Sequence, residues 1–143
     1  MWYEDLTSES NPRLRMVGWL EMGHTFSQGA VDEIVFRKLV ELLRDPWQPV
    51  VAGGFYSCTL CRFTGGPRYF EWNGTRVEMG CTNLYVPTDQ LVYVAPSMIL
   101  HYIDAHSYLP PMKFCDAVML CPVMRSIEYL KAVRQTGISI GNR

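Results

Sequence analysis

Two cysteines, Cys58 and Cys61, have the spacing of a zinc knuckle, in which a tight turn directs two thiolates at one metal ion. Downstream, the segment HYIDAH carries His101 and His106, and two histidines near a helix end form the other half of a two-cysteine, two-histidine site. Because these two independent half-motifs agree, the sequence predicts one structural zinc ion held by Cys58, Cys61, His101 and His106.

The spacing of the two histidines sets a condition for this site. Residues five apart on a regular helix differ in direction by about 140°, so the two rings diverge unless the helix unwinds at His106. The segment SYLPP follows His106 at once and supplies a helix stop. The two half-motifs are about forty residues apart, against about 12–15 in a compact zinc finger. We therefore expect a zinc-finger-like knuckle and helix, enlarged by a second hairpin.

Two further residues compete for a place at the metal. Cys81 follows a predicted hairpin and can substitute for one of the four ligands. His24 stands in the turn segment EMGHTF, where it is a polar group beside the site, a ligand in place of His106, or a surface residue. A surface or hydrogen-bonding position is the one favoured for His24.

The same residues also admit chemistry without a metal. A redox pair of Cys58 and Cys61 is disfavoured, because such a pair precedes a helix in a βαβ unit and here a Gly-Gly-Pro turn follows. A thiol nucleophile, Cys58 or Cys61, activated by His101 and oriented by Asp104 is a second alternative. The third alternative is a purely structural one, in which the cysteines are buried core residues and the histidines form hydrogen bonds.

Coordination by four protein ligands leaves no open position at the metal, which favours a structural ion over a catalytic one. The leading hypothesis is therefore a non-enzymatic protein that binds an unidentified protein or small ligand. The alternative is a small metal-dependent hydrolase with an open zinc site that uses His24. A third hypothesis is nucleic-acid binding through the basic last helix, which is also a candidate surface for oligomerisation.

The composition is that of an ordinary globular protein, with 143 residues, 48% hydrophobic and 19% charged. No uninterrupted apolar run reaches the length of a membrane span, and the first residues carry acids where a secretion signal needs basic residues. A cytoplasmic location is expected. The net charge of −1 disfavours a general nucleic-acid binder, although four basic residues stand against one acid from Arg125 onward.

Five cysteines in a cytoplasmic chain are expected to be thiols or metal ligands, not disulfides. Cys115 and Cys121 lie six residues apart on one predicted helix, so they point to different faces and should not form a bridge.

A helix is predicted over residues 31–43, where apolar residues recur at three- and four-residue spacing. Ser27 or Gly29 is the expected cap, and the segment DPWQP ends the helix. The apolar stripe consists of Val31, Ile34, Val35, Leu39, Leu42 and Leu43.

Strands are expected on both sides of this helix. Residues 15–22 predict a strand that enters a turn at Gly23-His24, and a short aromatic strand, GFYS, precedes Cys58. Residues 68–79 predict a hairpin around Asn73-Gly74, which places Glu71 opposite Arg76 and Phe70 opposite Val77. Residues 83–96 predict a second pair of strands around Thr88-Asp89.

Helices return after the second pair of strands. One is expected from Pro96-Ser97 to His106, another from Pro111 to Cys121, and a last one from Pro122 to a stop at Gly137. The order of elements predicts a single α+β domain over residues 1–143, with an antiparallel sheet and hairpins, one helix in the N-terminal half and two to three C-terminal helices.

Three stretches, GWLEMGHTFSQG, GFYSCTLC and LYVPTDQLVYVAPSMILHYIDAHSYLPPMKFCDAV, resemble a family of small uncharacterised bacterial proteins, a domain of unknown function. The shared motifs are Gly-His-x-Phe, Cys-x2-Cys and His-Tyr-Ile-x2-His-x-Tyr-x-Pro-Pro, and the resemblance covers residues 17–120. It implies that His24, Cys58, Cys61, His101 and His106 belong together, and it implies no activity. The helix over residues 122–137 lies outside it.

Overall fold

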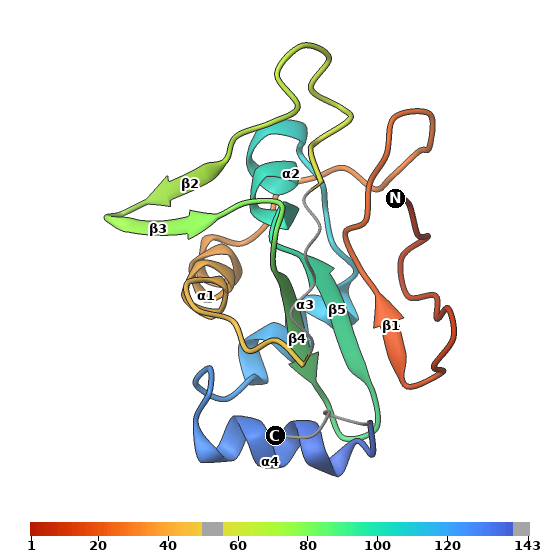
Figure 1. Cartoon of the computed structure of the whole chain (residues 1–143), viewed down its shortest axis with the longest axis vertical. Coiled ribbons are helices and arrows are strands. Elements are labelled where there is room, and N and C mark those ends of the chain that lie inside the picture. Colours follow the sequence, from red (N-terminus) through yellow and green to blue (C-terminus); the bar gives the residue numbers. More distant parts are fainter. Residues whose placement is uncertain (50–55, 139–143) are drawn as a thin grey trace.

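A three-stranded sheet forms the centre of the computed structural model, which describes residues 1–49 and 56–138 (Figure 1). The strand order is β1-β5-β4, with bounds Leu14–Met16, Val92–Pro96 and Asn83–Pro87. β1 is parallel to β5, and β4 is antiparallel to it, so the sheet is mixed where a purely antiparallel one was expected. Every residue of β5 is buried, as is usual for a central strand covered on both faces.

A separate two-stranded hairpin, β2 (Tyr69–Trp72) and β3 (Thr75–Glu78), projects to one side of the sheet. The helices are α1 (Glu33–Leu43), α2 (Ile99–His106), α3 (Met112–Leu120) and α4 (Ile127–Gln135). The predicted α+β class is therefore confirmed. Among the described residues, no helix combines the length and the apolar character that crossing a bilayer requires.

The strand expected over residues 15–22 is wrong in length, because β1 ends at Met16. Gly18 has a φ of +79°, a left-handed conformation that takes the chain out of the extended region. The indole N–H of Trp19 still donates to the carbonyl of Val94 at 2.9 Å, so the segment stays attached to the sheet. The predicted turn at Gly23-His24 is confirmed. Of the strand expected before Cys58, only Tyr56 and Ser57 are among the described residues, and neither is in a strand.

Helix α1 begins at Glu33 because the side chain of Asp32 accepts a hydrogen bond from the Ile34 amide at 3.0 Å. The expectation that Ser27 or Gly29 caps this helix is wrong. Of the expected apolar stripe, Leu39, Leu42 and Leu43 are buried as predicted, whereas Ile34 is 57% exposed. The buried face consists of Phe36, Leu39, Val40, Leu42 and Leu43.

The predicted register of the first hairpin is confirmed, with Glu71 opposite Arg76 and Phe70 opposite Val77. Asn73 and Gly74 have φ values of +48° and +81°, as a two-residue turn that matches the strand twist requires. Phe70 packs edge-to-face on Phe36 of α1, with ring centroids 5.7 Å apart. The second predicted pair, β4 and β5, is also present, and Thr88 closes its turn with a hydrogen bond from its amide to the Leu91 carbonyl.

The C-terminal helices begin later than their prolines indicate. Pro111 is the N-cap of α3 and not its first helical residue, and α2 begins at Ile99 instead of Ser97. The last helix, expected from Pro122, begins at Ile127, because Cys121 is extended and Ser126 supplies the cap. Gly137, with a φ of +81°, follows the helix end as predicted.

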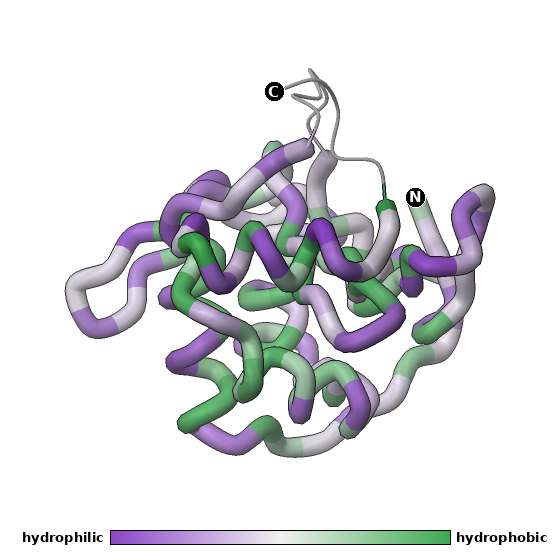
Figure 2. The backbone as a smooth tube through the Cα atoms, turned by 90° about the horizontal axis from the view of Figure 1, so that it is seen from below, coloured by the Kyte–Doolittle hydropathy of each residue, from purple (hydrophilic) through white to green (hydrophobic). Residues whose placement is uncertain are grey.

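Helix α4 lies across one end of the molecule, beside β4. Seen from that end, hydrophilic and hydrophobic residues alternate along it (Figure 2). Its inner side chains, Tyr129 and Val133, are fully buried, and the Tyr129 hydroxyl donates to the Tyr85 carbonyl at 2.6 Å. One hydrogen bond and two core side chains thus fasten α4 to the sheet.

Candidate metal centre

The two cysteines lie on a tight loop whose backbone is closed by its own hydrogen bonds. The Cys58 amide donates to the Gly65 carbonyl at 2.6 Å, and the Gly65 amide donates to the Cys61 carbonyl at 3.3 Å. Gly65 and Gly66 have φ values of +72° and +88°. A Cβ atom at Gly66 would lie 2.9 Å from the Cβ of Cys58, so only glycine lets the chain return this close to the first cysteine. We call residues 58–66 the knuckle loop.

The two histidines come from α2, which ends at the second of them. Ser107 has a left-handed φ of +56°, and the Tyr108 amide donates back to the Tyr102 carbonyl at 3.1 Å. The expectation that the helix unwinds directly after His106 is therefore confirmed. The change of direction brings the rings of His101 and His106 to a centroid distance of 5.0 Å at 84° to each other.

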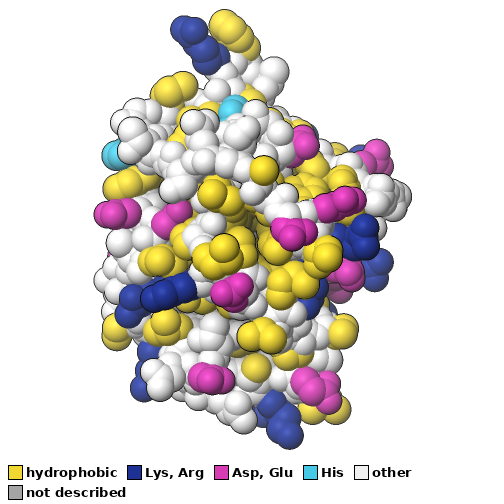
Figure 3. Space-filling view, turned by 180° about the vertical axis from the view of Figure 1, so that it is seen from behind, with side chains coloured by type: hydrophobic (Ala, Val, Ile, Leu, Met, Phe, Trp, Pro, Cys, Tyr) yellow, Lys and Arg dark blue, Asp and Glu magenta, His cyan; other side chains and the backbone are white. Residues whose placement is uncertain are grey.

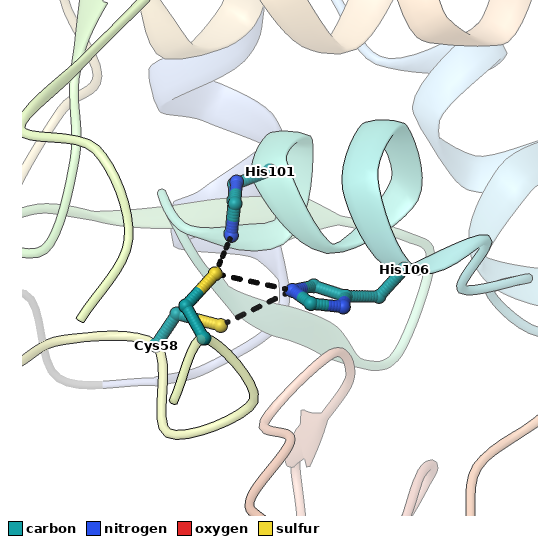
Figure 4. Close-up of side chains that lie close together, drawn as sticks. Cys58, His101 and His106 are labelled. Carbon is teal, nitrogen blue, oxygen red and sulfur yellow. Dashed lines mark hydrogen bonds between the residues drawn. The ribbon is translucent and has the colours of Figure 1, made fainter. Parts of the chain in front are cut away.

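The side chains of Cys58, His101 and His106 point toward one another from the knuckle loop and from α2 (Figure 4). Cys61 Sγ lies 3.2 Å from His101 Nε2 and 3.5 Å from His106 Nε2, and Cys58 Sγ lies 3.5 Å from His106 Nε2. One ligand atom from each of the four residues lies within 4.8 Å of all the others. These four residues could therefore hold one metal ion.

The spacing of the ligand atoms agrees with a tetrahedral ion. With metal–sulfur bonds of about 2.3 Å and metal–nitrogen bonds of about 2.05 Å, a tetrahedron places sulfur and nitrogen about 3.5 Å apart. Of the four sulfur–nitrogen pairs, two are 3.5 Å apart and one is 3.2 Å apart, and all ligand atoms lie within 4.8 Å of one another. An ordinary sulfur–imidazole hydrogen bond explains one such pair but not the meeting of four ligand atoms.

Burial controls the protonation of the site. Cys58 is fully buried and His101 is 8% exposed, whereas Cys61 and His106 are half-buried. Burial raises the pKa of the Cys58 thiol to about 11, against the opposing effect of hydrogen bonds from the Leu60 and Cys61 amides. Burial, followed by the proximity of His106, lowers the pKa of His101. The surroundings therefore favour the neutral imidazole of His101, which is the form that binds metal. They also favour the protonated thiol of Cys58, which would lose its proton on binding a cation.

These pKa shifts disfavour Cys58 as the thiol nucleophile considered from the sequence, and the other candidate, Cys61, has its Sγ 3.2 Å from His101 Nε2. A reactive cysteine needs a lowered thiol pKa and a charged partner, whereas the pKa of Cys58 is raised and that of His101 is lowered. Asp104 is exposed, and its charge raises the pKa of His101 only as the smallest of three effects.

His24 lies outside the group of four. It is exposed, and its ring stacks on the indole of Trp2, with centroids 4.0 Å apart and an interplanar angle of 10°. This arrangement agrees with the surface position favoured for His24. It does not agree with the family resemblance, which implied that His24 belongs with the four candidate ligands. The turn nevertheless contacts the knuckle loop, because the Met22 amide donates to the Thr59 hydroxyl at 2.8 Å.

The remaining cysteines are separate from the site. Cys81 is exposed and is not a member of the group, and all five cysteines are free thiols. The expectation that Cys115 and Cys121 form no disulfide is confirmed.

One supporting network escaped the sequence reasoning. Tyr108, two residues after His106, is fully buried, and its hydroxyl donates to Asp5 Oδ2 at 2.8 Å. The Gly18 amide donates to the other oxygen of Asp5 at 3.0 Å, and Phe26 packs edge-to-face on the Tyr108 ring. These contacts position the chain that leaves His106. The tyrosine of the His-x-Tyr-x-Pro-Pro segment was the only local signal, and its distant partner Asp5 carried none.

A family model described as a domain of unknown function (DUF7919) matches residues 1–119. The matched region includes all four candidate ligands and ends within α3, so α4 lies outside it. It also includes the N-terminal residues that precede the expected range of 17–120. No curated protein and no solved structure matches the chain.

Proposed function

This chain belongs to the DUF7919 family of domains of unknown function, and we propose that it is a non-enzymatic binding protein stabilised by one structural zinc ion. The ligands are Cys58, Cys61, His101 and His106. The observation that carries the proposal is the meeting of four ligand atoms within 4.8 Å, from two segments far apart in the sequence.

The chemistry of the ligands supports zinc. Two thiolates with two imidazoles form one of the common structural zinc sites, whereas calcium and magnesium are bound by oxygen ligands. Sulfur–nitrogen distances of 3.2–3.5 Å agree with the bond lengths of a tetrahedral zinc ion. A thiolate site also needs a reducing compartment, and the five free thiols support a cytoplasmic protein.

The closed ligand set supports a structural role. A catalytic zinc keeps a coordination position for water or substrate, whereas four protein ligands fill a tetrahedron. His24, which an open site would need as its acid or base, stacks on Trp2 at the surface. We therefore propose that the ion stabilises the fold and that the protein binds its partner at another surface.

Metal content and coordination test the proposal together. Protein purified without added metal and without chelator should contain one zinc per molecule by elemental analysis. After cobalt replaces zinc, the visible spectrum should not change between about pH 6 and pH 9, because a closed site has no bound water to ionise near pH 7. Absence of zinc from protein kept reduced would refute the metal site, and a spectrum that titrates would refute the structural role.

A further inference from the structure

Two adjoining cavities form one groove between the start of α1 and the elements on either side of it. The first, of about 520 Å³, lies between the chain around residues 30–35 and α3, and its lining includes Met112 and Met119. The second, of about 370 Å³, shares Ala30 and Val31 with the first and extends to Trp72 of the hairpin and Ile103 of α2. We call these two cavities together the α1–α3 groove.

The floor of the first cavity, between residues 30–35 and α3, is apolar and open to solvent. On α3, Met112 is 73% exposed and Met119 is 40% exposed, and their seven-residue spacing places them on one face with Cys115 between them. Val31 and Val35 line the opposite wall. Figure 3 views the molecule from the side on which α3 lies and shows hydrophobic side chains gathered in the middle of this face, with acidic side chains beside them.

The charged residues that line the groove are all acidic, and two cations lie next to it. The Arg37 guanidinium lies over the Trp72 ring at 5.9 Å, and the Lys38 ammonium donates to the Met119 carbonyl at 3.3 Å. The lining contains four carboxylates, Asp32, Glu33, Asp104 and Asp116, and no lysine or arginine. Asp32 caps α1, and Glu33 lies 3.7 Å from Arg37. Asp104 and Asp116 are exposed and form no salt bridge among the described residues. Two acidic groups are therefore accessible to a cation, one beside each cavity.

We propose that the α1–α3 groove binds a basic amphipathic helical segment of a partner protein. The apolar face of such a segment would cover the methionines and valines of the floor, and its lysines or arginines would pair with Asp104 and Asp116. Helix-in-groove recognition uses apolar anchors at three- and four-residue spacing, and methionine side chains adapt readily to different anchors. Opposite charges across the rim favour this partner over an acidic segment.

This inference deepens the proposed binding function and rests on it, but it does not depend on which metal the site holds. Zinc content and peptide binding are measured on the same samples, so the two proposals can fail separately. Folded protein with one zinc and no peptide binding would overturn the groove alone. Folded protein without zinc that binds the peptide at the groove would overturn the metal site alone.

The probe is a fluorescent peptide of about 18 residues, with leucine on one helical face and lysine on the other. Its binding to the full chain is followed by fluorescence anisotropy, and the contacted residues are identified from amide NMR shifts. We expect saturable binding that shifts the signals of Met112, Asp116 and Met119. A peptide of the same composition in scrambled order, and one with glutamate in place of lysine, should bind at least about tenfold more weakly.

Two variants and two matched controls locate the binding. Asp116→Lys and Met119→Gln should each weaken binding by about tenfold, because they remove the charge or the apolar anchor. Leu120→Gln changes an 83% exposed residue of the same helix outside the groove, and Glu128→Lys reverses an exposed charge on α4; neither should change binding. All four variants lie at exposed positions, and their melting temperatures should match that of the parent chain.

Several results would overturn the proposal. These are no saturable binding by the parent chain, equal binding of the scrambled peptide, and unchanged binding by Asp116→Lys and Met119→Gln. Sedimentation that shows a dimer dissociated by Met119→Gln would assign the groove to a second copy of this chain and would overturn it as well.

Discussion

At the scale of single residues, the candidate metal centre combines a buried thiol with a buried imidazole that both favour their neutral forms. Cys58 is fully buried, His101 is 8% exposed, and burial is the first cause of both pKa shifts. A divalent cation would compensate for the free-energy cost of a buried thiolate. The four candidate ligands include no lysine or arginine that could do so. The site is therefore better suited to binding metal than to nucleophilic chemistry.

Substitution of single residues should separate the four proposed ligands from their neighbours. Cys58→Ser and His101→Ala should each give zinc-free or insoluble protein, because a buried site with three ligands leaves the metal exchangeable and the fold weakened. Cys115→Ser, outside the site, should keep one zinc and cost only about 1–2 kcal/mol in the free energy of unfolding. Elemental analysis and denaturant unfolding of each variant provide the measurements.

The same series includes the two competing residues. Cys81→Ser and His24→Ala should both retain zinc, because one residue is exposed and the other stacks on Trp2. If Cys81→Ser strips the metal while His106→Ala does not, the ligand set is wrong.

The apparent zinc affinity should rise with pH. In the metal-free protein the pKa of Cys58 is about 11, so near neutral pH the thiol is protonated and zinc must displace that proton. Each unit of pH below this value should therefore weaken binding by at least about tenfold. The lowered pKa of His101 acts in the other direction, because it leaves the imidazole neutral and ready to bind down to a lower pH than usual.

Competition with a chromophoric chelator at several pH values measures this dependence. The chelator's own protonation must be included in the analysis. An affinity that stays constant from about pH 6.5 to pH 8.5 would show that no thiol proton is released and would contradict thiolate coordination.

At the scale of elements, the knuckle loop depends on glycines that no other residue can replace without strain. Gly66→Ala combines a φ of +88° with a Cβ atom only 2.9 Å from that of Cys58. Gly74→Ala, in the hairpin turn, has a similar φ of +81° but no atom within 4 Å of the added Cβ. The two positions therefore share the conformational strain and differ in the clash.

We expect Gly74→Ala to cost about 1 kcal/mol in the free energy of unfolding and to leave zinc binding unchanged. Gly66→Ala should cost clearly more and should also weaken zinc binding, because the clash displaces a ligand side chain. Unfolding curves and zinc competition measure both effects. Equal losses of stability with equal zinc affinity would mean that the close approach at Gly66 plays no part in positioning Cys58.

Helix α2 and the segment after it serve the site through their ends. The left-handed Ser107 ends the helix, and buried Tyr108 is held by Asp5 from the N-terminal part of the chain. Because His106 is the last residue of α2 and this anchor follows two residues later, the direction of its ring is set from both sides.

At the scale of the whole molecule, a bound ion would join two segments about forty residues apart, with the hairpin and two strands of the sheet between them. A structural zinc ion contributes on the order of 10 kcal/mol to folding, comparable to the whole stability of a small domain. Removal of zinc by a strong chelator, with a reductant present, should therefore lower the melting temperature sharply and loosen the knuckle loop first.

Thermal unfolding with and without chelator, followed by restoration with zinc, measures this effect. Hydrogen exchange should show the earliest loss of protection at the amides of Cys58 and Gly65, whose bonds close the loop. A melting temperature that does not change after complete removal of the metal would rule out a structural role for the ion.

The sequence by itself determined the features that depend on neighbouring residues. The Asn73-Gly74 turn is specified by the backbone conformations those two residues permit, and that turn sets the register of the hairpin. The prolines after His106 predicted the end of α2, and the cysteine and histidine spacings predicted which four residues meet. At the turn and at the helix end, local chemistry limits the chain to very few conformations. The four candidate ligands, from segments about forty residues apart, were identified instead by the set of side chains that one zinc ion needs.

Only the tertiary structure decided the features that depend on packing between distant segments. Nothing near Asp5 in the sequence indicates that Tyr108 will donate to it, and nothing near His24 indicates the stack on Trp2. The exposure of Ile34 and the groove between α1 and α3 likewise follow from which face of each helix meets the core. Apolar periodicity defines a stripe on a helix, but the rotation of that stripe and the gaps beside it are set by the shapes of the elements packed against it.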